Sequence, residues 1–273
     1  MKKILLIILV VVCSVQIGTA QETELKKSPI DFTVNLQTNH LWRGLVITDK
    51  PVVMVLTSVK LNKSGSFTAG VWGGMAVSNE VDATYYREID YFVQYAANGF
   101  SIGLWDIFDT RGFANRGLWD AFETREIAIP NIWDYDKETT GHLLDLRTSY
   151  NFGESFPLTL EADVLLYGSG ESQLNNNGDL ENRYSTYVQV AYPLIGNSNV
   201  NLDAFVGAGF SLTGLDTNLY VDGKDKFDLV NVGFTASKIV KLADLNIPVT
   251  ATTLWNPSYK IARVQLAVTL FKK

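Results

Sequence analysis

Residues 144–152 read Leu-Asp-Leu-Arg-Thr-Ser-Tyr-Asn-Phe, and residues 158–167 read Leu-Thr-Leu-Glu-Ala-Asp-Val-Leu-Leu-Tyr. In both stretches apolar side chains alternate with polar or charged ones, which is the two-residue period of a β-strand with one apolar face. An unbroken apolar row opposite a charged row is typical of strands that form a membrane-spanning barrel. A soluble sandwich gives the same alternation with its apolar face inward, so the alternation alone does not say which face meets water.

The N-terminus indicates the compartment. Lys2 and Lys3 precede an apolar run over residues 4–12, and Gly18-Thr19-Ala20 offers a small-residue cleavage site. This arrangement predicts a secreted chain. We therefore expect three parts, which are a signal peptide at residues 1–20, a polar leader at 21–30 and one barrel domain at 31–273.

Composition excludes several classes of function. The 23 lysines and arginines are outnumbered by 29 aspartates and glutamates, which argues against a nucleic-acid partner. Cys13 is the one cysteine and lies in the expected signal peptide, so the mature chain offers no disulfide, thiolate metal site or cysteine nucleophile. No apolar run near 18 residues follows the signal peptide, which excludes helical membrane spans.

Alternation and turn chemistry together predict an all-β fold, a transmembrane antiparallel up-and-down barrel of about twelve strands. Short connections alternate with longer, more polar ones, as in outer-membrane barrels, and an even strand number places both chain termini on the periplasmic side. The expected strands lie near residues 31–46, 52–61, 66–77, 87–97, 100–108, 141–152, 157–168, 184–194, 199–212, 227–239, 246–254 and 260–271.

Two hairpins allow a test of register. A two-residue type I′ turn at Asn98-Gly99 would pair Ala97 with Phe100 and keep the apolar rows of both strands on one face. Aligning the apolar rows of the strands at 141–152 and 157–168 sets Arg147 opposite Asp163. We expect those two side chains to form an ion pair.

Charged residues gather on the face opposite the apolar rows. The apolar rows carry almost no charge away from the strand ends, as hydrocarbon requires. The charged face could line a pore for small solutes or fill the barrel with a salt-bridge network. The candidate pore-lining residues are Arg43, Lys60, Glu88, Asp90, Asp145, Arg147, Glu161, Asp163, Asp203 and Arg263.

A tandem repeat extends the longest loop, at residues 109–140. Residues 103–111 recur with small changes at 117–125, and a third Trp-Asp pair begins at Trp133. A local duplication explains this repeat. The alternative is a folded-in constriction or an aromatic ligand patch built from Trp105, Trp119 and Trp133.

Three short motifs in the first third of the chain are Leu41-Trp42-Arg43-Gly44, Ala69-Gly70-Val71-Trp72-Gly73 and Glu88-Ile89-Asp90-Tyr91. Together they resemble the TorF-type porin family of signal-bearing outer-membrane barrels. The resemblance covers the first third of the chain by motif and the remainder by strand pattern. It implies an outer-membrane barrel with a channel role.

His40 and His142 are the only histidines. A lipid hydrolase would need a histidine beside a serine nucleophile, but Ser149, the nearest serine after His142, lies on the opposite row. We therefore expect rim histidines, no catalytic residue, no metal site, no cofactor and no enzymatic activity. A lipid-modifying enzyme that uses a cross-strand serine stays a third reading.

These observations lead to one main hypothesis and one principal alternative. The main hypothesis is a narrow passive channel for small hydrophilic solutes in the outer membrane of a Gram-negative bacterium. The alternative is a non-conducting barrel that acts as an interaction protein through its 109–140 loop. The expected partners are outer-membrane lipid, the solutes, and the barrel-assembly machinery. That machinery would read the terminal strand, which ends in the aromatic Phe271.

Overall fold

The computed structural model describes residues 28–78, 85–110, 131–175, 177–197, 200–213, 217–223 and 226–273. The expected signal peptide and most of the leader lie outside these residues. None of the described residues forms a helix that is long and apolar enough to cross a membrane.

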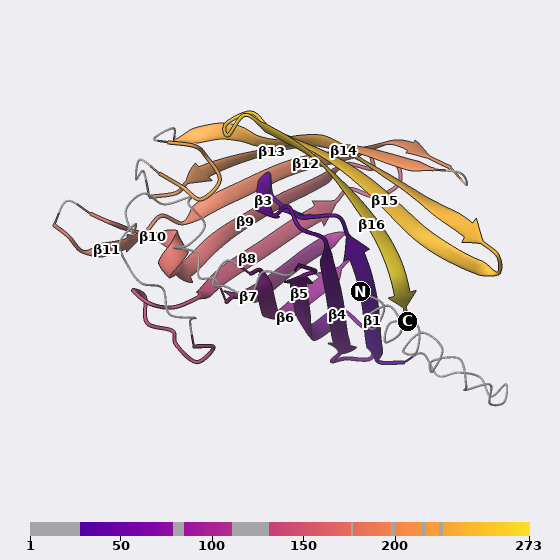
Figure 1. Cartoon of the computed structure of the whole chain (residues 1–273), viewed down its shortest axis with the longest axis horizontal. Coiled ribbons are helices and arrows are strands. Elements are labelled where there is room, and N and C mark those ends of the chain that lie inside the picture. The colour runs from indigo at the N-terminus through magenta and orange to yellow at the C-terminus, as the bar shows by residue number, and fades with distance from the viewer. Residues whose placement is uncertain are drawn as a thin grey trace.

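Twelve antiparallel strands form a closed barrel in which chain neighbours pair and the last strand, β16, pairs with the first, β1. Figure 1 shows the strands following one another around the wall. The expected all-β class and the expected number of strands are confirmed. The barrel strands are β1 (Ile30–Gln37), β4 (Val52–Lys60), β5 (Phe67–Ala76), β6 (Arg87–Ala97), β7 (Phe100–Asp109), β8 (His142–Asn151), β9 (Thr159–Gly168), β12 (Ser185–Gly196), β13 (Asn201–Ser211), β14 (Phe227–Leu242), β15 (Leu245–Asn256) and β16 (Ile261–Lys272).

Both register predictions are confirmed. Ala97 pairs with Phe100 across a turn in which Asn98 and Gly99 have φ values of 52° and 82°, as a type I′ turn requires. Arg147 is the register partner of Asp163 between β8 and β9. Local turn chemistry and the apolar rows therefore specify the pairing of these strands.

The expected first strand at 31–46 is wrong in its second half. β1 ends at Gln37, and the chain then forms a small separate hairpin from β2 (His40–Trp42) and β3 (Leu45–Thr48). Arg43 and Gly44, with φ values of 47° and 86°, make its two-residue turn. A Cβ on Gly44 would lie 2.0 Å from the carbonyl oxygen of Val230, so the tip touches the opposite side of the barrel. We call this element the inserted hairpin.

The outward rows of the barrel strands are mainly apolar, although Asp106 of β7 lies in the same outward row as Leu104 and opposite Leu144. Val93 on β6 and Val264 on β16 are 54% and 58% exposed, although both are aliphatic. Leu144, Leu146 and Val164, from the stretches quoted first, face the same side and are not part of the buried cluster. Exposed aliphatic rows on successive strands are what contact with acyl chains requires.

A buried apolar cluster occupies part of the interior. Leu45 and Ile47 of the inserted hairpin pack there with the inward Met54 of β4. Leu219 and Tyr220 of the loop between β13 and β14 join them. The lumen is therefore filled by chain where the hairpin and this loop meet.

Candidate functional site

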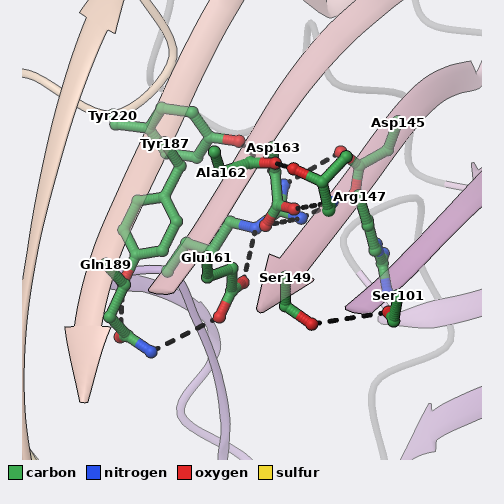
Figure 2. Close-up of polar contacts among 12 residues, drawn as sticks. Ser101, Asp145, Arg147, Ser149, Glu161, Ala162, Asp163, Tyr187, Gln189 and Tyr220 are labelled. Carbon is green, nitrogen blue, oxygen red and sulfur yellow. Dashed lines mark hydrogen bonds and ion pairs between the residues drawn. The ribbon is translucent and has the colours of Figure 1, made fainter. Parts of the chain in front are cut away.

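Arg43, at the tip of the inserted hairpin, connects the hairpin to the opposite wall. Figure 2 shows the carboxylates and tyrosines that gather there. Arg43 donates to both carboxylate oxygens of Asp145, from Nη1 at 3.1 Å and from Nη2 at 2.9 Å. Nη2 also lies 2.6 Å from Asp163 Oδ2, and Nε lies 4.0 Å from Glu161 Oε1. Nη1 donates further to Tyr220 Oη at 3.0 Å. We call these five residues the Arg43 cluster.

Burial makes this cluster energetically demanding. Asp145 is 0% exposed and Asp163 is 1% exposed. A buried carboxylate is tolerated only when a positive charge and hydrogen bonds replace its water. A planar guanidinium suits this role because its donors form a fork that matches a carboxylate. Arg43 therefore holds the hairpin tip at one place against β8 and β9.

The expected ion pair between Arg147 and Asp163 does not form, although their register is as predicted. Asp163 pairs with Arg43 instead. Arg147 turns along its own strand, where its Nε lies 2.6 Å from Asp145 Oδ2, and its guanidinium stacks 4.0 Å from the centre of the Trp105 ring. Arg43 of the inserted hairpin therefore occupies the position beside Asp163 that the alignment of these two strands predicted for Arg147.

A polar network extends the Arg43 cluster around the wall. Tyr187 Oη donates to Gln189 Oε1 at 2.7 Å, and Asn231 Nδ2 donates to Tyr187 Oη at 2.7 Å. Gln189 Nε2 donates to Glu161 Oε2 at 3.4 Å. The sequence-based set of pore-lining residues contains charged residues only and therefore lacks Tyr187, Gln189 and Asn231. Their inward rows were the available signal, since Tyr187 stands directly opposite Asp163.

Other candidate residues lie along the inner wall or at its ends. Lys60 pairs with Asp31 at 2.9 Å, where both side chains are partly exposed. Arg263 on β16 pairs with Asp49 at 2.9 Å, just after the inserted hairpin. Asp203 belongs to the inward row of β13. These three residues therefore lie outside the buried Arg43 cluster.

Glu88 and Asp90, the remaining two candidates, line a cavity of about 280 Å³ inside the barrel. Trp42 of the inserted hairpin and Trp105 of β7 form part of the same wall. Phe92 stacks on Trp105 with ring centres 4.2 Å apart. The structure thus combines carboxylates and indoles around one space in the lumen.

The three repeated tryptophans have different environments. Trp105 belongs to β7 and lines the cavity. Trp133 lies on the surface and is 82% exposed. Trp119 lies outside the described residues. The described part of the repeat thus places one indole on the inner wall and another on the outside.

The ring nitrogens of His142 are both engaged. Nδ1 lies 2.7 Å from Asp106 Oδ1, and Nε2 lies 2.8 Å from the carbonyl oxygen of Ile132. Tyr135 stacks on the ring with centres 4.0 Å apart. These contacts hold a loop against the barrel, and among the described residues both imidazole nitrogens are engaged by groups other than a serine. His40 stacks on Trp72 inside the lumen, with ring centres 5.6 Å apart.

Another buried carboxylate, that of Glu171, lies beyond the end of β9 in the 3-10 helix η3 (Ser169–Glu171). Burial raises the pKa of Glu171 to about 8, and the hydrogen bond from the Ser185 backbone, at 2.5 Å, acts in the opposite direction. Glu171 precedes a small hairpin of β10 (Ser172–Leu174) and β11 (Leu180–Asn182). The stability of this loop region should therefore depend on pH.

Comparison with solved structures finds a porin. The chain is similar to the NanC porin in its rhombohedral crystal form, with a TM-score of 0.43 and 8% sequence identity over 88% of this chain and 97% of that chain. Neither the protein-family profiles nor the curated proteins give a match. The fold class is that of a closed antiparallel barrel, and the TorF-type family stays a resemblance of three short motifs.

Proposed function

We propose that this chain is an outer-membrane barrel that forms a narrow passive channel for small hydrophilic solutes, after loss of its signal peptide in a Gram-negative cell. The observation that carries the proposal is the division of the wall. Aliphatic side chains are exposed outward on successive strands, while charged and hydrogen-bonded side chains occupy the inward rows. Lipid outside and water inside is the environment that suits this division.

The inserted hairpin makes the proposed channel narrow. It fills part of the lumen with a buried apolar cluster and is held there by Arg43. Twelve strands enclose more room than eight, whose side chains fill the interior, and less than the 16–18 of open porins. A low conductance therefore follows.

The charge of the lumen gives the proposed selectivity. Glu88, Asp90, Asp145, Glu161 and Asp163 are acidic. In the described part of the chain, Arg43 pairs with three of them, and Arg147 pairs with Asp145 and lines the same cavity as Glu88 and Asp90. An acidic lumen favours cations by its potential. The proposed channel is therefore selective for cations.

Planar-bilayer recording of the purified full chain tests the proposal. Wild-type protein should give small unitary currents, with a reversal potential in a salt gradient that indicates cation preference. A variant in which residues 39–48 are replaced by a short Gly-Ser linker should conduct more, because the obstruction is removed. Absence of current from both proteins would contradict the proposal and favour the non-conducting interaction protein.

A specific observation keeps that alternative worth testing. Trp133 is 82% exposed on the described part of the longest loop, and exposed indoles are enriched at binding surfaces. If neither the wild-type protein nor the linker variant gives current in bilayers, binding of the protein to cell surfaces tests the interaction role. Loss of that binding in Trp133→Ala would support the role.

A further inference from the structure

We infer that the lumen cavity is a binding site for a small organic cation that carries both an ammonium group and a hydroxyl or other oxygen acceptor. The inference rests on the proposed function in one respect, because it names the solute class of the same lumen. Three features of the cavity point to such a ligand, which are its unpartnered polar atoms, its charge and its aromatic wall.

Three of the residues that line the cavity each carry a buried polar atom that has no hydrogen-bond partner among the described residues. These atoms are Asp90 Oδ1, Gln37 Oε1 and Trp105 Nε1. Asp90 is 4% exposed, so its carboxylate oxygen is removed from bulk water. A buried polar atom without a partner costs about 1–3 kcal/mol, and a charged one costs more. A ligand that reaches these three atoms would therefore need two donors and one acceptor.

The charges around the cavity favour a cation. Glu88 and Asp90 are neighbours on the inward row of β6, and Arg147 is the cationic residue among those that line the cavity. Its charge is shared, since Arg147 also forms the 2.6 Å ion pair with Asp145. A ligand ammonium would bring the missing positive charge to Asp90 and donate the hydrogen bond that Oδ1 lacks.

The aromatic wall determines how the ligand would contact Trp105. Phe92 stacks 4.2 Å from this ring and the Arg147 guanidinium lies 4.0 Å from its centre. Two groups so close to one ring must cover its two faces, so the indole offers its N–H edge. That edge needs an oxygen acceptor. A hydroxyl beside the ammonium group would satisfy both Trp105 and Asp90.

The size of the space and its position give the remaining limits. A cavity of about 280 Å³ matches a single sugar ring or an amino alcohol. Leu41 and Trp42 of the inserted hairpin line one side. The ligand would therefore bind against the element that narrows the lumen, and its binding would stabilise the inserted position of the hairpin.

The probes are three sugars of one ring size and different charge. Glucosamine at mildly acidic pH is a cation, glucose is neutral and glucuronate is an anion. Tryptophan fluorescence of the detergent-solubilised full chain reports binding, because three indoles, those of Trp42, Trp72 and Trp105, line the cavity. Glucosamine should bind with at least about tenfold higher affinity than glucose, the gain expected from one charge-assisted hydrogen bond. Glucuronate should not bind.

Two variants and a matched control localise the site. Asp90→Asn removes the charge and should weaken glucosamine binding about tenfold or more. Trp105→Phe keeps a stacking ring but loses the N–H donor, and it should weaken glucose and glucosamine equally. Asp179→Asn removes the same charge from an exposed turn between β10 and β11 and should bind like wild type.

Each outcome decides one of the two proposals. Equal affinities for glucose and glucosamine, or unchanged glucosamine binding by Asp90→Asn, would overturn the organic-cation site. Binding without bilayer current would leave the site standing and refute the channel. Current without binding would do the reverse. Heat-modifiable migration on gels shows which variants have folded, and Trp105→Phe tests the site if Asp90→Asn does not fold.

Discussion

Replacing Arg43 by alanine should release the inserted hairpin. The substitution removes the guanidinium that contacts Asp145, Asp163 and Glu161 and leaves the first two carboxylates buried. Loss of one partner of a buried ion pair costs about 3–5 kcal/mol, because the remaining charge has no compensation. Asp145 keeps Arg147 at 2.6 Å, so Asp163 carries most of the cost. We therefore expect a loss of about 3 kcal/mol in the free energy of unfolding.

The chain supplies a matched control for this prediction. Arg263 also ties this segment to the wall, through Asp49 at 2.9 Å, but its side chain is 39% exposed and that of Asp49 is 52% exposed. An exposed ion pair contributes about 0–1 kcal/mol. Arg263→Ala should therefore lower the free energy of unfolding far less than Arg43→Ala.

Urea unfolding in lipid vesicles measures both variants, and bilayer recording follows the lumen. Arg43→Ala should lower the urea midpoint and increase the mean current as the hairpin leaves the lumen. Adding Asp163→Asn should recover part of the lost stability, because it removes the uncompensated charge. It should not restore a single narrow current level, because no guanidinium then fixes where the hairpin tip lies. An Arg43→Ala variant with wild-type stability and wild-type conductance would refute the role of Arg43 as the anchor of the hairpin.

Three further predictions concern other elements of the barrel. Glu171 has a pKa raised from 4.5 to about 8, so the folded state binds the extra proton and its stabilisation is complete below pH 4.5 and lost as the pH rises to 8. Glu171→Gln should flatten this decline, whose size is up to about a few kcal/mol. A wild-type urea midpoint that is the same at pH 5 and at pH 8 would argue against it. Gly44→Ala should lower the free energy of unfolding by at least about 1–3 kcal/mol. The reason is that φ is +86° and a Cβ would lie 2.0 Å from the Val230 carbonyl oxygen. An unchanged urea midpoint would contradict that packing. Phe271 packs on Phe32 with ring centres 5.6 Å apart and is the proposed signal to the assembly machinery. Phe271→Ala should therefore slow insertion of the barrel in cells. Insertion at the wild-type rate would exclude that role.

The barrel was predictable because its determinants are local and periodic. A two-residue alternation fixes which face each side chain takes, and a turn such as Asn98-Gly99 fixes the offset between adjacent strands. Those two rules were sufficient to pair Ala97 with Phe100 and Arg147 with Asp163. Neither rule requires knowledge of residues that are distant in the sequence.

The inserted hairpin was not predictable in the same way. Residues 31–46 have enough apolar and polar alternation to resemble one long strand, and the turn at Arg43-Gly44 contains an arginine where Asn or Asp is usual. The partners of Arg43 lie more than 100 residues away on β8 and β9. A comparison of β8 with β9 alone therefore assigned Asp163 to Arg147. The true partner, Arg43, comes from residues 31–46, which were expected to form one strand of the barrel wall.

Buried ion pairs contribute position more than stability, and the inserted hairpin illustrates the distinction. Its apolar residues, Leu45 and Ile47, pack with aliphatic and aromatic neighbours, and such apolar contacts have no preferred direction. Arg43 has one place in which its donors meet Asp145, Asp163 and Tyr220 together. Apolar burial thus favours an inserted hairpin, while the guanidinium selects where its tip lies. The double variant Arg43→Met with Asp163→Asn should then keep the hairpin inside the lumen but broaden the distribution of unitary currents. A single sharp current level in that variant would show that packing alone sets the position of the hairpin tip.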